Sequence, residues 1–488
     1  MNKKKPFIVD VIALTSVPIF SQVIGILIVP IITRMYTPDT FGISNLLGTV
    51  VMLFATFSTM GYHRGIILPK NKNTAIGLVY LCLSITLIVT ILIAFIIIFL
   101  KDFIIFQTNS PILGSFLWLT PLFVFFHGLF QVLRFWNIRL NQFGNIAISR
   151  VTDIVSKKSV QLFAGIFGYA TAGGLIVADL FAIIFKNLFL LKSFSLQIFH
   201  LGSRKYSLLK LIAIAKRYKK FPKYFVWSEW LIRIPIFFTS FIIAKYFGQD
   251  ILGYYSLGLL VLSLPSLLIG GAVSEVFSPR AAEAKHKGEH VVLLNEIFYR
   301  LLKLMLFPFM ILGLFGDRLF SIVFSPEWIT AGIIAQVLSI RVLFDTIFAP
   351  VFTFTNILEK QELEFTRSFV NTLIVICSML MGVYFNNFET ALWLITILDS
   401  LLIITLGIYL MRIINFPIFK ILQKFSIYCI ICFSVGLMLK LFDNFFSLST
   451  INFLIVIFFA TISYYGMLLA TDRVLFKKIR QVILSFIK

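Results

Sequence analysis

The residues most able to do chemistry in this chain are charged side chains inside long apolar runs. One such run carries Arg150, Asp153, Lys157, Lys158 and Gln161. At about 100° per helical residue, four of these five share one stripe, and Lys158 points away from it. One carboxylate among three cations leaves positive charge unbalanced. That surplus predicts a site for an anionic group such as a phosphate, held by charge-assisted hydrogen bonds.

Two further apolar runs contain a charged pair at i,i+4 spacing. Glu229 stands four residues before Arg233, and Arg341 stands four before Asp345. An ionisable group deep in a bilayer is costly, so such residues face a cavity or pair with one another. The predicted substrate-binding set is Arg150, Lys157, Lys158, Gln161, Arg233 and Arg341. The alternative is that these residues form salt bridges that fix helix packing.

The acids of these runs have a second interpretation. Asp153, Glu229 and Asp345 could bind a proton or sodium ion that drives a transport cycle. Asp179, Lys186 and Asp399 are expected to be structural.

The composition shows which solvent these charges meet. Of 488 residues, 59% are hydrophobic and 13% are charged, whereas a soluble domain has about 25% charged residues. This composition excludes a soluble enzyme. About 20 apolar residues of helix cross a bilayer, and fourteen runs meet that length approximately. They are residues 8–32, 42–61, 75–99, 111–133, 145–168, 170–191, 224–246, 253–275, 296–316, 329–354, 366–385, 389–411, 425–442 and 450–471.

The basic residues between these runs predict the orientation. With a cytoplasmic N-terminus, 32 of the 43 Lys and Arg lie on the cytoplasmic side and five on the outer side. This asymmetry agrees with the positive-inside rule. It accounts for most of the net charge of +22, so no nucleic-acid partner is expected. The basic C-terminal tail is expected to lie on the inner membrane surface.

A short pattern occurs twice, 211 residues apart. Arg34 to Gly42 and Lys245 to Gly253 share a base, an aromatic residue, an aspartate, an apolar residue and a final glycine at equal spacing. The copies start six spans apart, so they have the same orientation and predict a parallel repeat around a central path. Arg34 and Lys245 are expected to anchor the loops at the interface. With Gly42 and Gly253 they are candidate gate residues.

The repeat predicts the domain organisation. The expected fold is an all-α integral membrane protein with about 14 transmembrane helices. It comprises an N-terminal lobe (1–192), a basic cytoplasmic linker (193–223), a C-terminal lobe (224–415) and two extra helices with a basic tail (416–488).

Several motifs in both halves resemble a known family. They are Arg34…Pro38-x-x-Phe41-Gly42, Lys219-Lys220-Phe221-Pro222…Ser228, Phe247-Gly248…Leu252-Gly253-Tyr254-Tyr255-Ser256-Leu257, Leu264-Pro265 and Phe277-Ser278-Pro279-Arg280. Together they resemble the polysaccharide transporter family of the multidrug/oligosaccharidyl-lipid/polysaccharide (MOP) exporter superfamily, over roughly residues 1–420. Fourteen spans exceed the twelve common in O-antigen flippases and are similar to the related lipid II flippases.

The resemblance implies a flippase of the bacterial cytoplasmic membrane with both termini in the cytoplasm. Its substrate would be an undecaprenyl-diphosphate-linked oligosaccharide of the O-antigen or capsule type, moved to the outer leaflet by alternating access. The other expected partners are membrane lipids, with further glycan-assembly membrane proteins as an open possibility.

Two other functions remain open at this stage. A cation-coupled multidrug exporter of the same superfamily would need an acidic or aromatic site, against which the basic surplus argues. A glycan polymerase or glycosyltransferase would need long outer loops with catalytic residues, and the outer loops here are short. No catalytic constellation, phosphate-binding loop or metal-ligand set is readable, so neither a cofactor nor a metal is expected.

Overall fold

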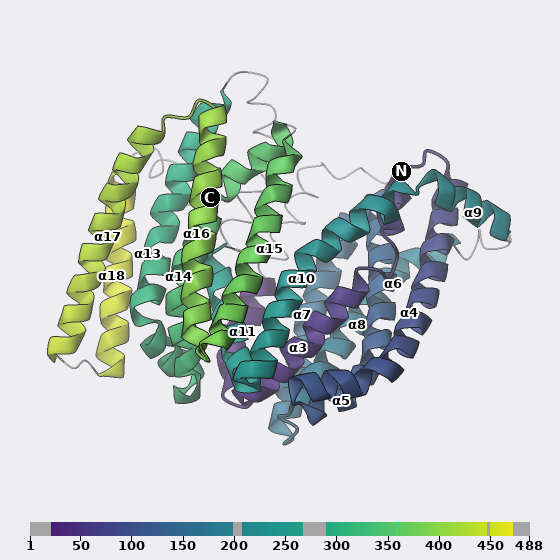
Figure 1. The fold of residues 1–488 in the computed structure, drawn as a ribbon, viewed down its shortest axis with the longest axis horizontal. Coiled ribbons are helices and arrows are strands. Elements are labelled where there is room, and N and C mark those ends of the chain that lie inside the picture. The colour runs from purple at the N-terminus through teal and green to yellow at the C-terminus, as the bar shows by residue number, and fades with distance from the viewer. Residues whose placement is uncertain (1–20, 199–206, 267–288, 359, 447–448, 472–488) are drawn as a thin grey trace, which may run out of the picture. The chain divides into compact units, whose positions relative to one another are not determined.

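A computed structural model describes residues 21–198, 207–266, 289–358, 360–446 and 449–471. Within these ranges all regular secondary structure is helical (Figure 1). A described helix overlaps every one of the fourteen predicted runs. The C-terminal tail and the Phe277–Arg280 motif lie outside the described residues.

The helices follow one another with short connections. In chain order they are α2 (Val29–Thr33), α3 (Pro38–Ala55), η1 (Tyr62–Ile67), α4 (Lys72–Thr108), α5 (Pro111–Phe116), η2 (Leu117–Leu119), α6 (Thr120–Arg139), α7 (Phe143–Ile166), α8 (Ala172–Ile198), α9 (Leu208–Arg217), η3 (Phe221–Phe225), α10 (Val226–Ile242), η4 (Ile243–Phe247), α11 (Gln249–Pro265), α13 (His290–Phe324), η6 (Pro326–Trp328), α14 (Ile329–Ile357), α15 (Gln361–Tyr384), α16 (Phe388–Ile413), α17 (Ile418–Phe446) and α18 (Thr450–Thr471).

Local sequence explains where these helices begin and end. Pro38 occupies the first helical position of α3, where its missing N–H costs nothing. The Asn71 side chain accepts a hydrogen bond from the Asn73 amide and so caps α4. Gly168 adopts a φ of +82° between α7 and α8, a conformation that costs glycine little. That glycine makes the predicted tight turn of the α7–α8 hairpin.

The helices carry their apolar side chains outward as well as inward. Ten described helical segments are long and apolar enough to cross a membrane, and Ser21–Thr33 and Thr450–Gly466 are shorter apolar helices. On α4, Phe95, Phe99 and Phe106 are 60%, 68% and 78% exposed. A contiguous apolar outer surface of this kind suits lipid rather than water. The chain is therefore a multi-pass integral membrane protein with about twelve apolar helices.

Helices α7 and α11 overlap predicted runs but do not belong to that set of apolar helices. Four charged residues interrupt α7, and the described part of α11 has only 17 residues.

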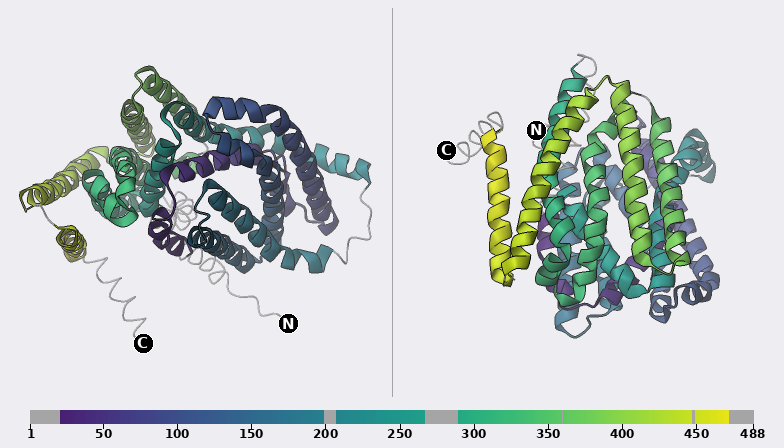
Figure 2. Two further views of the ribbon diagram at one scale, coloured as in Figure 1. Left: turned by 90° about the horizontal axis from the view of Figure 1, so that it is seen from below. Right: turned by 60° about the vertical axis from the view of Figure 1, so that its left-hand side comes forward.

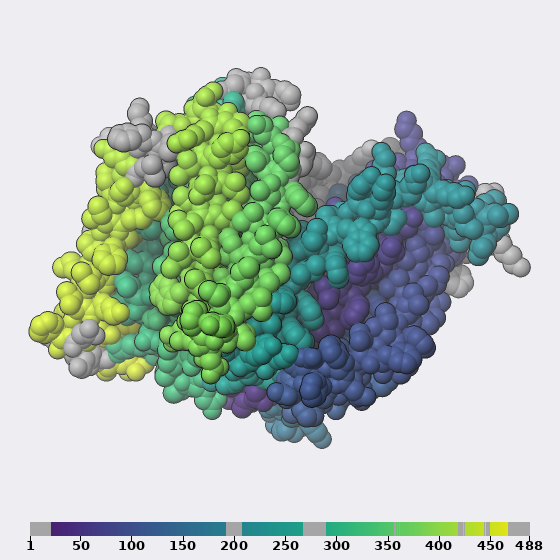
Figure 3. Space-filling model, viewed as in Figure 1, coloured from purple at the N-terminus to yellow at the C-terminus, as the bar shows by residue number. Residues whose placement is uncertain are grey.

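The Cα packing divides the chain into two units. Unit 1 comprises residues 1–257, 323–331 and 372–391, and unit 2 comprises the rest. Within each unit the long helices run side by side (Figures 1 and 2). In unit 1, α7 packs along α8, α6 packs along both α4 and α8, and α10 packs against α3. The short helix α9 lies on the surface of α4 (Figure 3).

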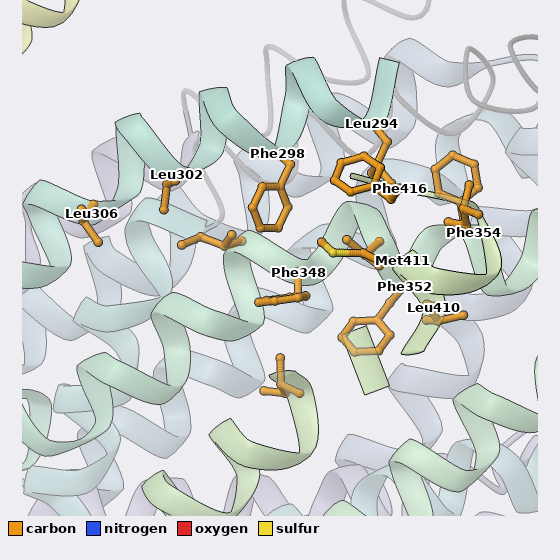
Figure 4. Close-up of a cluster of buried hydrophobic side chains, with 14 of the residues drawn as sticks. Leu294, Phe298, Leu302, Leu306, Phe348, Phe352, Phe354, Leu410, Met411 and Phe416 are labelled. Atoms are coloured by element: carbon orange, nitrogen blue, oxygen red, sulfur yellow. The ribbon is translucent and has the colours of Figure 1, made fainter. Parts of the chain in front are cut away.

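The core of unit 2 is formed mainly by aromatic and aliphatic side chains. Phe298 of α13, Phe348 of α14 and Leu410 of α16 are buried in one cluster (Figure 4). Phe315 of α13 and Phe453 of α18 form a second cluster, with ring centroids 5.5 Å apart. The two lobes and their boundaries at residues 192, 223 and 415 remain predictions.

Candidate functional site

The charges of α7 are tied to α8 by two ion pairs. Lys157 pairs with Asp179, and Lys186 Nζ lies 3.1 Å from Asp153 Oδ2. Asp153 therefore forms its ion pair with Lys186 of the neighbouring helix rather than with a cation of its own helix. The contact between α7 and α8 brings these two side chains together.

Lys158 and Gln161 form a separate pair on α7. Lys158 Nζ donates to Gln161 Oε1 at 3.1 Å. The Gln161 side chain is buried, and its backbone oxygen accepts a 2.8 Å hydrogen bond from the Tyr36 hydroxyl. The hydrogen-bond partner of Lys158 is therefore a neutral amide rather than a carboxylate.

Four arginines from different helices form what we term the arginine cluster: Arg64, Arg134, Arg150 and Arg233. Arg134 lies within electrostatic range of Arg64 and Arg150. Two histidines connect this trio to the fourth arginine. His63 interacts electrostatically with Arg64, Arg134 and His127, and His127 interacts with Arg233.

Within the described ranges, one carboxylate pairs with this cluster. Arg64 Nη2 lies 3.4 Å from Glu229 Oε1, and the Arg64 guanidinium stacks 3.6 Å from the Phe225 ring centroid. The expected i,i+4 pair of Glu229 with Arg233 is therefore wrong, because η1 presents Arg64 to α10 instead. Among the described residues, Arg134, Arg150 and Arg233 have no carboxylate partner.

The charges of unit 1 do not balance. Apart from Arg139 at the end of α6, the described side chains of η1, α6, α7, α8 and α10 include seven cations (Arg64, Arg134, Arg150, Lys157, Lys158, Lys186 and Arg233) and three carboxylates (Asp153, Asp179 and Glu229). The surplus among these residues is four positive charges, and an uncompensated charge inside a bilayer is costly. Such a surplus is suited to binding an anion with several charged oxygens, for which arginine has matching geometry.

Burial also acts on the histidine beside the cluster. His63 lies in η1, between the spans, and its Nδ1 is 2.6 Å from the Thr59 hydroxyl oxygen. Desolvation, with smaller contributions from Arg64 and Arg134, lowers the pKa of His63 to about 3. This histidine is therefore neutral at physiological pH and adds no charge to the cluster.

Sequence reasoning missed Arg64 and Arg134. Both were counted with the cytoplasmic loops, because hydropathy alone places the ends of spans two and four near them. A usable signal existed for Arg134: it directly follows Leu133 and lies five residues before Arg139, where α6 ends. One more helical turn places Arg134 inside the span.

Arg341 and Asp345 belong to unit 2 and have different partners from those expected. Arg341 Nε pairs with Asp399, whose side chain is 3% exposed. Asn371 Nδ2 donates to the other Asp399 oxygen at 2.6 Å. Asp345 lies 3.5 Å from Arg367, so the i,i+4 pair of Arg341 with Asp345 is wrong. Here contacts between helices again replace contacts along one helix.

Arg367 holds a second carboxylate as well. Its Nη2 lies 2.8 Å from Glu364 Oε1, and its guanidinium lies 4.6 Å from the Phe352 ring centroid. The acids of this group in unit 2 are Asp345, Glu364 and Asp399, against the bases Arg341 and Arg367. Unit 2 therefore has no cationic surplus among these residues.

The two copies of the repeated loop meet through their glycines. A Cβ on Gly42 would lie 1.8 Å from the backbone oxygen of Gln249, and one on Gly253 would lie 1.8 Å from that of Pro38. Pro38 and Gln249, like Gly42 and Gly253, are related by the 211-residue shift. The contact is thus reciprocal, and the backbones of α3 and α11 touch where each copy has its glycine.

Aromatic residues and polar contacts surround this glycine contact. The Trp328 ring lies 5.1 Å from Phe41 and 5.9 Å from Tyr254, and its indole N–H donates to the Thr33 carbonyl at 2.9 Å. Lys245 donates to the Gln107 side chain at the end of α4. Arg34 lies just after α2 with its side chain exposed.

No group of three His, Cys, Asp or Glu side chains that could hold a metal ion occurs in the described part of the chain. Five acids of the candidate regions each form an ion pair with a Lys or Arg side chain: Asp153, Asp179, Glu229, Asp345 and Asp399.

The fold matches solved transporters of the MOP superfamily. A structure described as lipid II flippase MurJ in an inward closed conformation superposes with a TM-score of 0.72 at 14% identity, covering 94% of this chain and 99% of MurJ. An inward-facing multidrug resistance MATE family transporter of the MOP superfamily gives 0.59 at 13% identity, covering 83% and 98%. A Vibrio cholerae MATE transporter gives 0.51 at 13% identity, covering 86% and 98%. These likenesses define the fold, which is that of the MOP transporters.

The family follows from the sequence match. Residues 31–333 match the polysaccharide biosynthesis protein family, and the chain belongs to that family. No curated protein matches the chain. Family and fold together describe a multi-pass membrane protein of a polysaccharide biosynthesis family with the fold of the MOP transporters.

Proposed function

We propose that the protein is a flippase that moves an undecaprenyl-diphosphate-linked oligosaccharide, of the O-antigen or capsule type, from the inner to the outer leaflet. The observation that carries this proposal is the arginine cluster in unit 1, in which four arginines share one carboxylate, Glu229. Membership of a polysaccharide biosynthesis family and a fold shared with a lipid II flippase support the same substrate class.

In this proposal the arginine cluster binds the diphosphate. Arg134, Arg150 and Arg233 have no carboxylate partner among the described residues, so an arriving anion does not have to displace one. Lys158, paired only with Gln161, adds a further cation. Lys157 and Arg341 contribute less directly, because Asp179 and Asp399 already neutralise them.

The proposed topology has fourteen spans. The ten long apolar helices and two shorter ones account for twelve. Adding α7, whose charges would face the substrate, and α11, which overlaps the predicted run 253–275, gives fourteen. Both termini are proposed to lie in the cytoplasm of a bacterial cell, on the evidence of the positive-inside count.

We further propose that the Gly42–Gly253 contact is a gate between the repeats. Backbone contact without side chains allows two helices to close tightly and to separate without breaking a side-chain network. Arg34 and Lys245 flank the contact as interfacial anchors. The gate opens and closes one end of the substrate path during alternating access.

A cation-coupled drug exporter is the alternative within this fold. It would need carboxylates available to a drug, a proton or sodium ion. Asp153, Glu229 and Asp345 each have a basic partner. The positive charge around the arginine cluster would repel cationic drugs, and this favours the flippase.

A reconstituted transport assay tests the proposal. Purified protein in liposomes is given labelled undecaprenyl-diphosphate oligosaccharide, and transfer is measured as exposure of the sugar to an added lectin. Wild-type protein should move the lipid without changing its mass. Arg134→Gln and Arg150→Gln should each lower the rate about 10- to 100-fold, the factor for about 1.5–3 kcal/mol per charged hydrogen bond.

The matched control is Arg300→Gln, which removes a surface arginine paired with Glu296. It should transport at nearly the wild-type rate. Normal transport by Arg134→Gln and Arg150→Gln would exclude the cluster as the diphosphate site, and absence of transfer by wild-type protein would exclude the flippase.

A further inference from the structure

A pocket of about 820 Å³ opens where the segment from η1 to α4 meets the turn between α6 and α7. Its charged lining residues are Lys70, Lys72 and Arg139, and no acidic side chain lines it. Trp136 and Phe143 contribute to its apolar wall. None of the four arginines of the arginine cluster lines it, and its volume lies within the range of small-molecule sites.

The cations of this pocket have little other structural use. Lys70 and Lys72 are exposed, and neither forms an ion pair with any residue in the described ranges. Arg139 Nη1 donates to the carbonyls of Ile66 and Ile67 at 3.1 and 3.4 Å. These bonds hold the guanidinium at the pocket wall without neutralising it. The pocket therefore presents three positive charges to whatever enters.

The surface of helix α9 indicates what kind of anion the pocket would bind. Its Leu211 and Ile214 pack on the cluster that contains Trp136. Leu208 and Leu209 instead point outward and are 75% and 78% exposed. Helix α9 lies on α4 at the surface of unit 1 (Figure 3).

The length and charge of the segment around α9 place it at a membrane surface. Ten residues of helix span about 15 Å, half the bilayer core, so α9 cannot cross the membrane between α8 and α10. From Lys192 to Lys223 the sequence has nine basic residues and no acid. Exposed leucines beside basic residues are the pattern of a helix lying in an anionic lipid surface.

We propose that this face of unit 1 binds an anionic phospholipid, with its phosphate in the pocket of Lys70, Lys72 and Arg139. Leu208 and Leu209 lie among the acyl chains beside it. Free phosphate would satisfy the three cations equally well, but it would leave the two leucines uncovered. The proposal does not depend on the transported substrate, because it uses none of the arginine cluster.

Equilibrium binding of a fluorescent phosphatidylglycerol to the purified full-length protein in detergent tests the pocket. Fluorescent phosphatidylcholine is the neutral comparison. Lys70→Gln/Lys72→Gln should weaken phosphatidylglycerol binding about 25-fold, from roughly fivefold for each cation near a lipid surface. Phosphatidylcholine binding should not change. The matched control Lys101→Gln/Lys440→Gln makes the same charge change elsewhere and should bind like wild type.

Two further arms identify the ligand. Leu208→Ser/Leu209→Ser should weaken phosphatidylglycerol binding severalfold, and millimolar inorganic phosphate should not displace the lipid. Wild-type affinity in Lys70→Gln/Lys72→Gln overturns the proposal, and so does an equal loss in the control pair. Complete displacement by inorganic phosphate, or no effect of the leucine changes, overturns the assignment to a lipid.

Discussion

Replacing Gly42 by alanine tests the proposed gate most directly. The new Cβ would lie 1.8 Å from the Gln249 oxygen and 2.8 Å from its carbonyl carbon. Cβ atoms essentially never approach another heavy atom within 3.0 Å, so α3 and α11 must separate by about 1.2 Å or more. Both atoms belong to the backbone, and no side-chain rotation can relieve the contact.

The cost of that separation follows from overpacking. Inserting a methyl group into a packed interface costs about 1–3 kcal/mol, and a rigid backbone neighbour favours the upper half of that range. About 2–3 kcal/mol changes an equilibrium by a factor of roughly 30 to 150. Gly42→Ala should therefore shift the protein away from the conformation with α3 and α11 in contact, and the lipid-flipping rate should fall by at least tenfold.

The repeat provides a second, stricter test. Gly253→Ala creates the reciprocal clash with Pro38 and should have a similar effect. Once one alanine has separated the helices, the second clash is partly relieved. The Gly42→Ala/Gly253→Ala double variant should therefore lose less stability than the sum of the two single changes, measured as thermal unfolding in detergent.

Gly48→Ala is the control on the same helix. Nothing lies within 4 Å of its Cβ position, so the change should be neutral or should stabilise α3 by about 0.5–1 kcal/mol. Equal transport by the Gly42→Ala and Gly48→Ala variants would refute the gate, as would strictly additive effects of Gly42→Ala and Gly253→Ala.

Three other predictions concern charge. Lys157→Gln leaves Asp179 without its partner, and since both side chains are about one-third exposed the free energy of unfolding should fall by about 1 kcal/mol. The double variant Lys157→Gln/Asp179→Asn should recover the melting temperature. If it also recovers transport, the role of Lys157 is structural. Arg341→Gln should destabilise by about 3–5 kcal/mol because it leaves Asp399 buried and uncompensated, and added Asp399→Asn should rescue melting; a stable single variant would contradict this. The pKa of His63 is about 3 in the folded state against 6.5 in the unfolded state, so the unfolded state binds more protons between these values. Between pH 7.5 and pH 5 the wild type should therefore lose about 2 kcal/mol of unfolding free energy relative to His63→Gln. An equal change in melting temperature for both proteins would contradict the burial of a neutral imidazole.

The positions of the helices could be predicted from the sequence because hydropathy and helix length are local properties. A described helix overlaps each predicted run, and about twelve of these helices are apolar. The turn between α7 and α8 lies at Gly168, between the two runs predicted there. The charge partners could not be predicted. Spacing along a helix favoured Glu229 with Arg233, whereas Arg64 lies 165 residues away in sequence and reaches Glu229 through tertiary packing.

For the repeated glycines too, the sequence predicts a local property but not a tertiary contact. The 211-residue shift identified Gly42 and Gly253 as equivalent, but no periodicity states that two equivalent residues touch. Their contact depends on how α3 and α11 cross. Arg134 was missed for a related reason, because hydropathy places the end of a span only within a turn of helix.

The distribution of charge between the units gives the strongest reason to separate substrate binding from structural charge. A diphosphate carries its negative charge on several oxygens and needs more than one cation that is not already neutralised. In unit 1 the cations Arg134, Arg150, Lys158 and Arg233 have no carboxylate partner among the described residues. In unit 2 the described group of Arg341 and Arg367 faces Asp345, Glu364 and Asp399, so binding an anion there would require breaking an ion pair. The anionic headgroup is therefore expected to bind to unit 1. Neutralising arginines in unit 1 should impair transport more than stability, and neutralising Arg341 should do the reverse.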